Sequence, residues 1–186
     1  QNVKRNKEDN MILSDGTLRR MQSQFVYPAE DHLINPASID IRIGRELIEE
    51  DGFGTATKKV NLEKYTERVP YLLQPRQFVL IATYERLMVP NGYVVEMKLK
   101  SSIARKGFNH SLAFHFDPGW DGIGTMEVHN ITQHTNLPLW YGMRFGQVII
   151  HRLDEDAEKP YSGRYQNANS VDGSKKDVKS LNNSIS

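Results

Sequence analysis

Short runs in which apolar and polar residues alternate recur along the chain, and proline, glycine or asparagine bounds most of them. In residues 38–43, isoleucine alternates with serine, aspartate and arginine, and residues 93–99 alternate in a similar way. Alternation with a period of two places successive side chains on opposite faces of a β-strand. The first of these strands is expected to be half-buried and to end at Gly44, because glycine interrupts the pattern.

Later segments repeat the strand pattern, whereas helical spacing is rare. Strands are predicted for QFVLIATYERL, GTMEVHN, LPLWYGMRF and QVIIHRL. Ser14 and Asp15 precede a short segment in which Leu18 and Met21 fall on one helix face. Residues 49–68 show little pattern and are interpreted as a surface excursion. Many short strands with one or two short helices predict an all-β fold, either a sandwich or a barrel.

Composition narrows the class of protein. The 186 residues suit one domain that buries a core without disulfides or metal. A net charge of +1 gives no electrostatic case for binding nucleic acid or an anionic membrane. The chain has no cysteine, which excludes a thiol nucleophile and a thiolate zinc site. No apolar run approaches the roughly 20 residues of a membrane span, so a soluble, cytoplasmic protein is expected.

The chain divides into three parts by composition. Residues 1–10 are polar and are interpreted as a flexible leader or a remnant of an expression vector. Residues 11–160 carry the strand patterns and are predicted to form the β domain. Residues 161–186 are predicted to be a flexible tail, since their polar end cannot bury enough apolar surface to order alone. This tail is expected to be able to close over a ligand.

The segment KSSIAR, residues 100–105, directly follows a predicted strand. Backbone N–H groups at the start of a helical turn bind anions, and serine hydroxyls add donors. Lys100 and Arg105 bring positive charge to the same place. The segment is interpreted either as a phosphate cradle or as a capped turn with two solvated cations. These six residues alone favour the capped turn.

Two carboxylates are further candidates. Glu127 is the single charged residue of the strand GTMEVHN, and burial there would raise its pKa towards values useful for proton transfer. An exposed strand glutamate is the commoner case. Asp117 precedes Pro118, Gly119 and Trp120, which is turn chemistry, although it would also suit binding of a sugar hydroxyl. The histidines show no spacing typical of a zinc site.

Taken together, these segments resemble the dCTP deaminase family of the trimeric dUTPase-like superfamily. The resemblance rests on MILSDGTLRR, INPASIDIRIG, KSSIARKG, HSLAFHFDPGWDG, GTMEVHN, NLPLWYGMRFGQV and PYSGRYQ. A spaced set of motifs is more specific than any one member. The resemblance implies a distorted, jelly-roll-like β-barrel, a homotrimer with sites between subunits, and hydrolytic deamination of dCTP to dUTP and ammonia.

The resemblance also implies residue roles. Glu127 would be the general base and acid, Ser101 and the Ala113 carbonyl would hold the attacking water, and Arg105 would support this network. Mg²⁺ would bridge the triphosphate oxygens, and no zinc would be required. The nucleotide would be bound by Lys100, Ser101, Ser102, Arg105, Asp117, Trp120, Tyr161, Arg164 and Gln166.

The sequence departs from the family pattern in three places, and other functions stay open. Leu99 replaces a glycine, residues 107–110 are one residue short, and Ala168 replaces a glutamine that would contact phosphate. One alternative is a bifunctional enzyme that also gives dUMP and diphosphate, with Asp117 activating water against the α-phosphate. Another is a catalytically silent nucleotide- or protein-binding module on the same fold. A preference for 5-substituted cytosine is also open.

Overall fold

The computed structural model describes residues 11–50, 57–110 and 115–173, and strands dominate this part of the chain. Its two α-helices are short, and neither is long and apolar enough to span a membrane. The expected all-β class is confirmed. The helices are α1 (Asp15–Met21) and α2 (Ser101–Ala104), with single 3₁₀ turns at Gln22–Gln24, Asp31–Leu33 and Leu62–Lys64. The strands are β1 (Met11–Ile12), β2 (Val26–Tyr27), β3 (Ile34–Asn35), β4 (Ser38–Glu50), β5 (Thr57–Asn61), β6 (Tyr71–Leu73), β7 (Phe78–Met88), β8 (Tyr93–Leu99), β9 (Phe108–His110), β10 (His115–Phe116), β11 (Asp121–Asn130), β12 (Leu137–Leu139) and β13 (Arg144–Arg152).

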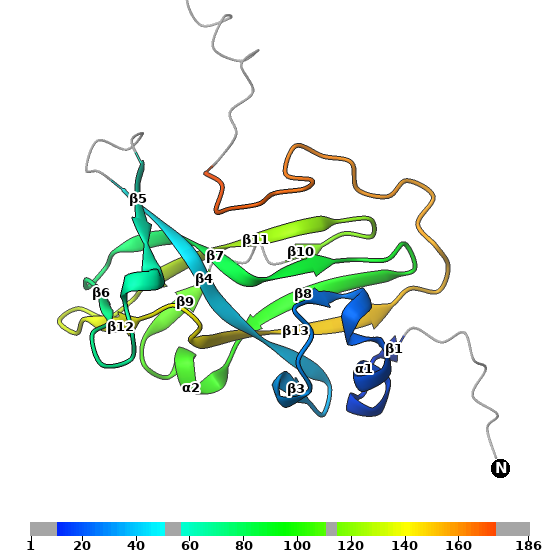
Figure 1. The fold of residues 1–186 in the computed structure, drawn as a ribbon, viewed down its shortest axis with the longest axis horizontal. Coiled ribbons are helices and arrows are strands. Elements are labelled where there is room, and N and C mark those ends of the chain that lie inside the picture. The colour runs from blue at the N-terminus through cyan, green and yellow to red at the C-terminus, as the bar shows by residue number, and fades with distance from the viewer. Residues whose placement is uncertain (1–10, 51–56, 111–114, 174–186) are drawn as a thin grey trace, which may run out of the picture.

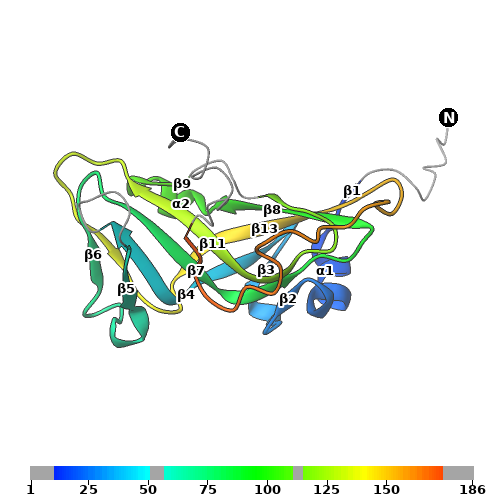
Figure 2. The ribbon, with the colours of Figure 1, turned by 90° about the horizontal axis from the view of Figure 1, so that it is seen from above.

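One antiparallel sheet contains all the described strands except β6 and β12, which pair with each other. Its main path runs in the order β10-β8-β13-β4-β7-β11-β9. The long strand β4 joins the two halves, because its first residues pair with β13 and its later residues pair with β5 and β7. β4 runs diagonally across the molecule in Figure 1, and the sheet curls into a half-open barrel (Figure 2).

The core lies inside this curl, as the alternation of apolar residues predicts. Ile39, Ile41 and Ile43 of β4 are fully buried there. The rings of Phe108 and Phe145 meet edge to face with centroids 5.3 Å apart, a favourable aromatic arrangement. Helix α1 begins at the predicted place and adds the fully buried Leu18 to the core.

Gly44 does not end β4, contrary to the expectation. The strand continues to Glu50, and its pairing with β7 shifts register between Ile43 and Leu47. A Cβ atom on Gly44 would lie only 2.5 Å from the carbonyl oxygen of Thr83 on β7. Glycine is therefore required here for the close approach of two backbones at a bulge, and the strand itself is not broken.

Residues 49–68 are not simply a surface excursion, so that interpretation is wrong for its second half. β5 lies in this segment and pairs with the later residues of β4. Val60 and Leu62 are both buried against the core. The alternation of apolar residues here is too short to be recognised among the lysines and glutamates. Pairing with β4 stabilises β5 as a strand.

The tail follows β11 after the last strand. The orange segment that leaves β13 in Figure 1 turns back over the sheet. The Asn167 N–H donates to the Asp121 carbonyl, and the Ile123 N–H donates to the Ala168 carbonyl, both at 2.7 Å. Asn167 and Ala168 therefore pair with an edge of β11 that β9 leaves open. Residues 174–186 lie outside the described part of the chain.

Candidate active site

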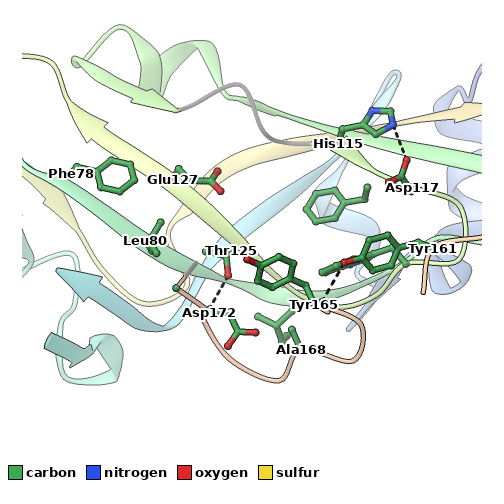
Figure 3. A pocket seen from close by; sticks show the side chains of 14 residues that line it. Phe78, Leu80, His115, Asp117, Thr125, Glu127, Tyr161, Tyr165, Ala168 and Asp172 are labelled. Carbon is green, nitrogen blue, oxygen red and sulfur yellow. Dashed lines mark hydrogen bonds and ion pairs between the residues drawn. The ribbon is translucent and has the colours of Figure 1, made fainter. Parts of the chain in front are cut away.

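A cavity of about 590 Å³ lies on the face of β7 and β11 that points away from the main core (Figure 3). Its size is that of a small-molecule binding site. The tail closes one side of it. The described residues that line it are Phe78, Leu80, His115, Phe116, Asp117, Trp120, Ile123, Thr125, Glu127, Tyr161, Tyr165, Ala168, Asp172 and Gly173.

Glu127 reaches this cavity because β11 alternates strictly. Every second residue of β11 is buried in the core, and the intervening residues, including Thr125 and Glu127, point the other way. The Oε2 atom of Glu127 is buried and accepts no hydrogen bond from the described residues. Burial raises the pKa of the Glu127 carboxyl above its ordinary value, while its own backbone N–H and the charge of His110 offset part of that rise. A raised pKa makes the ionised carboxylate a stronger base, which suits a group that takes up a proton during a reaction.

Aromatic rings form the end of the cavity near Asp117. Trp120 packs between Phe116 and Tyr161, with ring centroids 5.5 Å and 5.3 Å away. The indole Nε1 of Trp120 is a buried donor that has no acceptor among the described residues. Asp117 itself is exposed at this end, and its Oδ1 lies 3.3 Å from His115 Nε2. The arrangement offers stacking surfaces beside hydrogen-bonding groups that a ligand can satisfy.

The tail is held against β11 and the turn before it by hydrogen bonds and by one buried apolar residue. Gln166 donates through Nε2 to the Gly119 carbonyl at 2.8 Å, and its Oε1 accepts from the Asp121 N–H at 3.2 Å. The Asp172 N–H donates to Thr125 Oγ1 at 3.1 Å (Figure 3). Val171 is fully buried in a small cluster separate from the main core. Gln166 thus fixes the tail to the turn in this structure, whereas Arg164 is exposed.

The serine turn lies elsewhere on the chain. Ser101 and Ser102 open helix α2, and both are exposed, as is Arg105 just after it. None of the residues of this turn lines the cavity around Glu127. Within one chain the predicted site residues therefore form two separate groups. One group is the α2 turn, and the other lines the Glu127 cavity.

Lys100 has a structural partner within the chain. Its Nζ lies 2.5 Å from Oδ1 of Asp40, whose side chain is only 2% exposed. Asn35 donates to the same oxygen at 2.7 Å, and a guanidinium nitrogen of Arg144 lies 3.7 Å from Oδ2. Buried charges require such partners. Lys100 consequently joins β8 to β4, beside the turn that carries the two serines.

The charges around the cavity are mostly negative. Its titratable groups are Asp117, Glu127, Asp172 and His115, together with two tyrosines, and no lysine or arginine is among the described lining residues. The part of the chain that the structure describes contains no cluster of histidine and acidic side chains that would hold a metal ion. The cavity is therefore suited to the uncharged part of a ligand more than to a group of phosphates.

The family model for dCTP deaminase-like proteins matches residues 12–153, which span the β domain. The chain belongs to the dCTP deaminase family. The match ends before the tail. The tail residues that line the Glu127 cavity therefore lie outside the region that the family model matches.

Curated members of the dCTP deaminase family resemble the chain over most of its length. The dCTP deaminase of Pyrococcus horikoshii is 35% identical over 156 residues, which cover 84% of this chain and 92% of that protein. A "dCTP deaminase, dUMP-forming" of Streptomyces coelicolor is 34% identical over 168 residues, covering 83% of this chain and 87% of that protein. The identities of these two relatives to this chain differ by one percentage point.

A solved structure confirms the fold. The 2′-deoxycytidine 5′-triphosphate deaminase from Agrobacterium tumefaciens superposes with a TM-score of 0.63 at 19% identity, over 77% of this chain. The match covers 48% of that longer chain. At this identity the likeness concerns the arrangement of the strands and not the residues of the site.

Several cavity residues of this dCTP deaminase family member were not predicted from the sequence. Ile123 and Thr125 lie on the same face of β11 as Glu127, and the alternation of apolar and polar residues in β11 could have predicted this. Phe78 and Leu80 come from β7, and only the strand register brings them to Glu127. Ala113 lies outside the described residues, so its expected contact with the attacking water stays a prediction.

Proposed function

We propose that the protein catalyses the hydrolytic deamination of dCTP to dUTP and ammonia. The observation that carries this proposal is the environment of Glu127, a carboxyl set in a cavity of nucleoside size with one buried oxygen that accepts no hydrogen bond from the described residues. Membership of the dCTP deaminase family supplies the substrate.

In this reaction Glu127 moves the protons. It takes one from a water molecule as that water adds to C4 of the cytosine ring, and it delivers the proton to N3. It then takes the proton of the new C4 hydroxyl and delivers it to the amino group, so that the C–N bond breaks, ammonia leaves and the C4 carbonyl of uracil forms. The raised pKa of Glu127 favours its uptake of a proton from water. Ser101 and the Ala113 carbonyl hold the water, and Arg105 supports this network.

The complete site is formed by two copies of the chain in a homotrimer. The cavity around Glu127 carries carboxylates, whereas dCTP carries several negative charges on its phosphates. The exposed α2 turn offers the opposite charge through Arg105 and Lys106, together with the hydroxyls of Ser101 and Ser102. The α2 turn of one subunit would therefore meet the triphosphate of a nucleotide whose base lies in the cavity of its neighbour.

The remaining expected contacts fit the nucleoside. Asp117, at the mouth of the cavity, would bind the deoxyribose, and Trp120 and Tyr161 would shape the sugar pocket. Arg164 and Gln166 would approach the phosphates from the tail, with Gln166 first giving up its bonds to the turn. Mg²⁺ would bind together with the nucleotide, because phosphate oxygens and water molecules are its usual ligands.

A second function has support of its own. Relatives from Streptomyces coelicolor and Leifsonia xyli bear the name dCTP deaminase, dUMP-forming, at 34% identity. A bifunctional enzyme of this type would deaminate dCTP and then cleave the bond at the α-phosphate, giving dUMP and diphosphate. Asp117 is exposed at the end of the cavity, where it would activate the second water.

One incubation tests these functions together. The protein is mixed with dCTP and MgCl₂, ammonia is assayed, and nucleotides are separated by chromatography. dUTP indicates a deaminase, and dUMP with diphosphate indicates the bifunctional enzyme. A lack of both refutes the two proposed functions and is the result expected of a silent nucleotide- or protein-binding module. Glu127→Gln is the matched control, because it should bind dCTP as the wild type does and release no ammonia.

A further inference from the structure

The pairing of β7 with β11 contains an irregularity three residues before Glu127. Ile123 lies opposite Arg86, but Thr125 lies opposite Ala82. Between these two pairs β11 has one residue, Gly124, whereas β7 has three, residues 83–85. Extra residues on one strand form a bulge, which bends the strand and changes the pairing beyond it.

The side chain of Thr83 bridges this bulge. Thr83 is 2% exposed, and its hydroxyl donates to the Glu85 carbonyl at 2.7 Å. The same hydroxyl accepts a hydrogen bond from the Gly124 N–H at 2.9 Å. It thereby closes the bulge on β7 and replaces the carbonyl that a regular ladder would have offered to Gly124.

Side chains pack closely around Gly124 at this point. A Cβ atom on Gly124 would lie 3.2 Å from Thr83 Cγ2 and 3.2 Å from the ring of Phe116, which lines the cavity. On the other side of β7, the backbone of Gly44 packs directly on the Thr83 carbonyl. The bulge is therefore closely packed at both of these glycines.

The bulge decides what lies beside Glu127. If the pairing of Ile123 with Arg86 continued regularly, Glu127 would fall opposite Ala82, because residue numbers across an antiparallel pair change in opposite directions. In the structure Glu127 lies opposite Leu80. The irregularity thus shifts Glu127 by two residues along β7 and brings its carboxyl towards Leu80 and Phe78.

We propose that Thr83 is a positioning residue for Glu127, because its hydroxyl holds the β7 bulge that sets the register of the catalytic strand. The inference rests on the proposed role of Glu127 in proton transfer. Thr83 does not line the cavity and so acts only through β11. A displacement of about 1 Å in a reacting group can lower a rate by about 100-fold.

Thr83→Val and Thr83→Ser test this role, since the first removes the hydroxyl at similar size and the second keeps it. Thr83→Val is expected to lower kcat for ammonia release from dCTP by about 10- to 100-fold. Its KM should change little, and the acidic limb of its pH–kcat profile should move. Thr83→Ser should keep the wild-type pH profile and most of the wild-type kcat.

The outcomes separate this inference from the proposed function. Absence of ammonia release by the wild type refutes the deaminase itself. An active wild type together with a Thr83→Val enzyme of unchanged kcat and pH profile refutes only the role of Thr83. Equal losses in the valine and serine variants also refute it, since a variant that keeps the hydroxyl would then lose as much activity as one that lacks it. If Thr83→Val does not fold, Thr83→Cys replaces it, because a thiol is a weaker hydrogen-bonding group than the serine hydroxyl.

Discussion

Glu127 of β11 lies directly opposite Leu80 of β7, so the candidate catalytic carboxyl has an apolar neighbour across the sheet. His129 and Phe78 form the next pair on the same face. Cross-strand neighbours on one face of an antiparallel pair are in contact range. The raised pKa of Glu127 is thus a consequence of strand register, which surrounds a charged group with side chains that cannot solvate it.

The first prediction concerns pH. A general base must be ionised, and the pKa of Glu127 is raised above 4.5, so kcat/KM should fall on its acidic side at a pH above that value. Leu80→Asn places a polar group beside the carboxylate and should shift this acidic limb to lower pH. The measurement is a pH profile of kcat/KM for dCTP deamination. Leu72→Asn, at an exposed position of β6, is the control and should leave the limb unchanged.

The second prediction concerns the assembly of the site from two copies. Glu127→Gln and Arg105→Ala should each be inactive alone, but mixed trimers should recover activity. In any mixed trimer one site of the three combines an intact Glu127 with an intact Arg105, so about one third of the wild-type kcat is expected for closed threefold symmetry. The two variants are co-expressed with different tags and purified through both. Inactivity of the doubly purified protein would place both residues in the same subunit's site or show that the trimer is wrong.

The third prediction concerns the structural role of Lys100 as the partner of the buried Asp40. Lys100→Met leaves the buried Asp40 without its closest cation. The free energy of unfolding should fall by about 3 kcal/mol, towards the low end for breaking a buried pair, because Asn35 and Arg144 remain. Denaturant unfolding measures the change. Lys98→Met, which removes an exposed lysine two residues earlier on β8, should cost much less. Equal stability of both variants would contradict the structural role.

The fourth prediction concerns the anchor of the tail. Val171 packs against Ile48 and Ala82, outside the main core. Val171→Asp would bury a charge there, so the tail should detach from the cavity. KM for dCTP is expected to rise by about tenfold, equivalent to about 1.4 kcal/mol of binding. The thermal midpoint should change little, because the main core is untouched. Asn169→Asp adds the same charge at an exposed position and should not alter KM, whereas an unchanged KM in Val171→Asp would show that the tail does not form the site.

The sequence by itself contained the elements and the chemistry of single residues. Alternation with a period of two is a local property, and it located the buried isoleucines of β4, whereas the face to which Glu127 points was left open. The spaced motifs were sufficient for the family, which the matching family model confirms. The position of helix α1 was also predicted from its local spacing, although the Ser14 side chain makes no capping bond.

Only the tertiary structure decided which distant residues meet. Lys100 pairs with Asp40 across 60 positions, and Leu80 reaches Glu127 because three residues of β7 bulge opposite Gly124. Val171 anchors the tail in a cluster made by two other strands. Local propensity cannot encode such contacts, since each depends on the register between strands and on what space the folded backbone leaves. The sequence therefore determined the strands and the reactive group, and the fold determined the environment in which that group works.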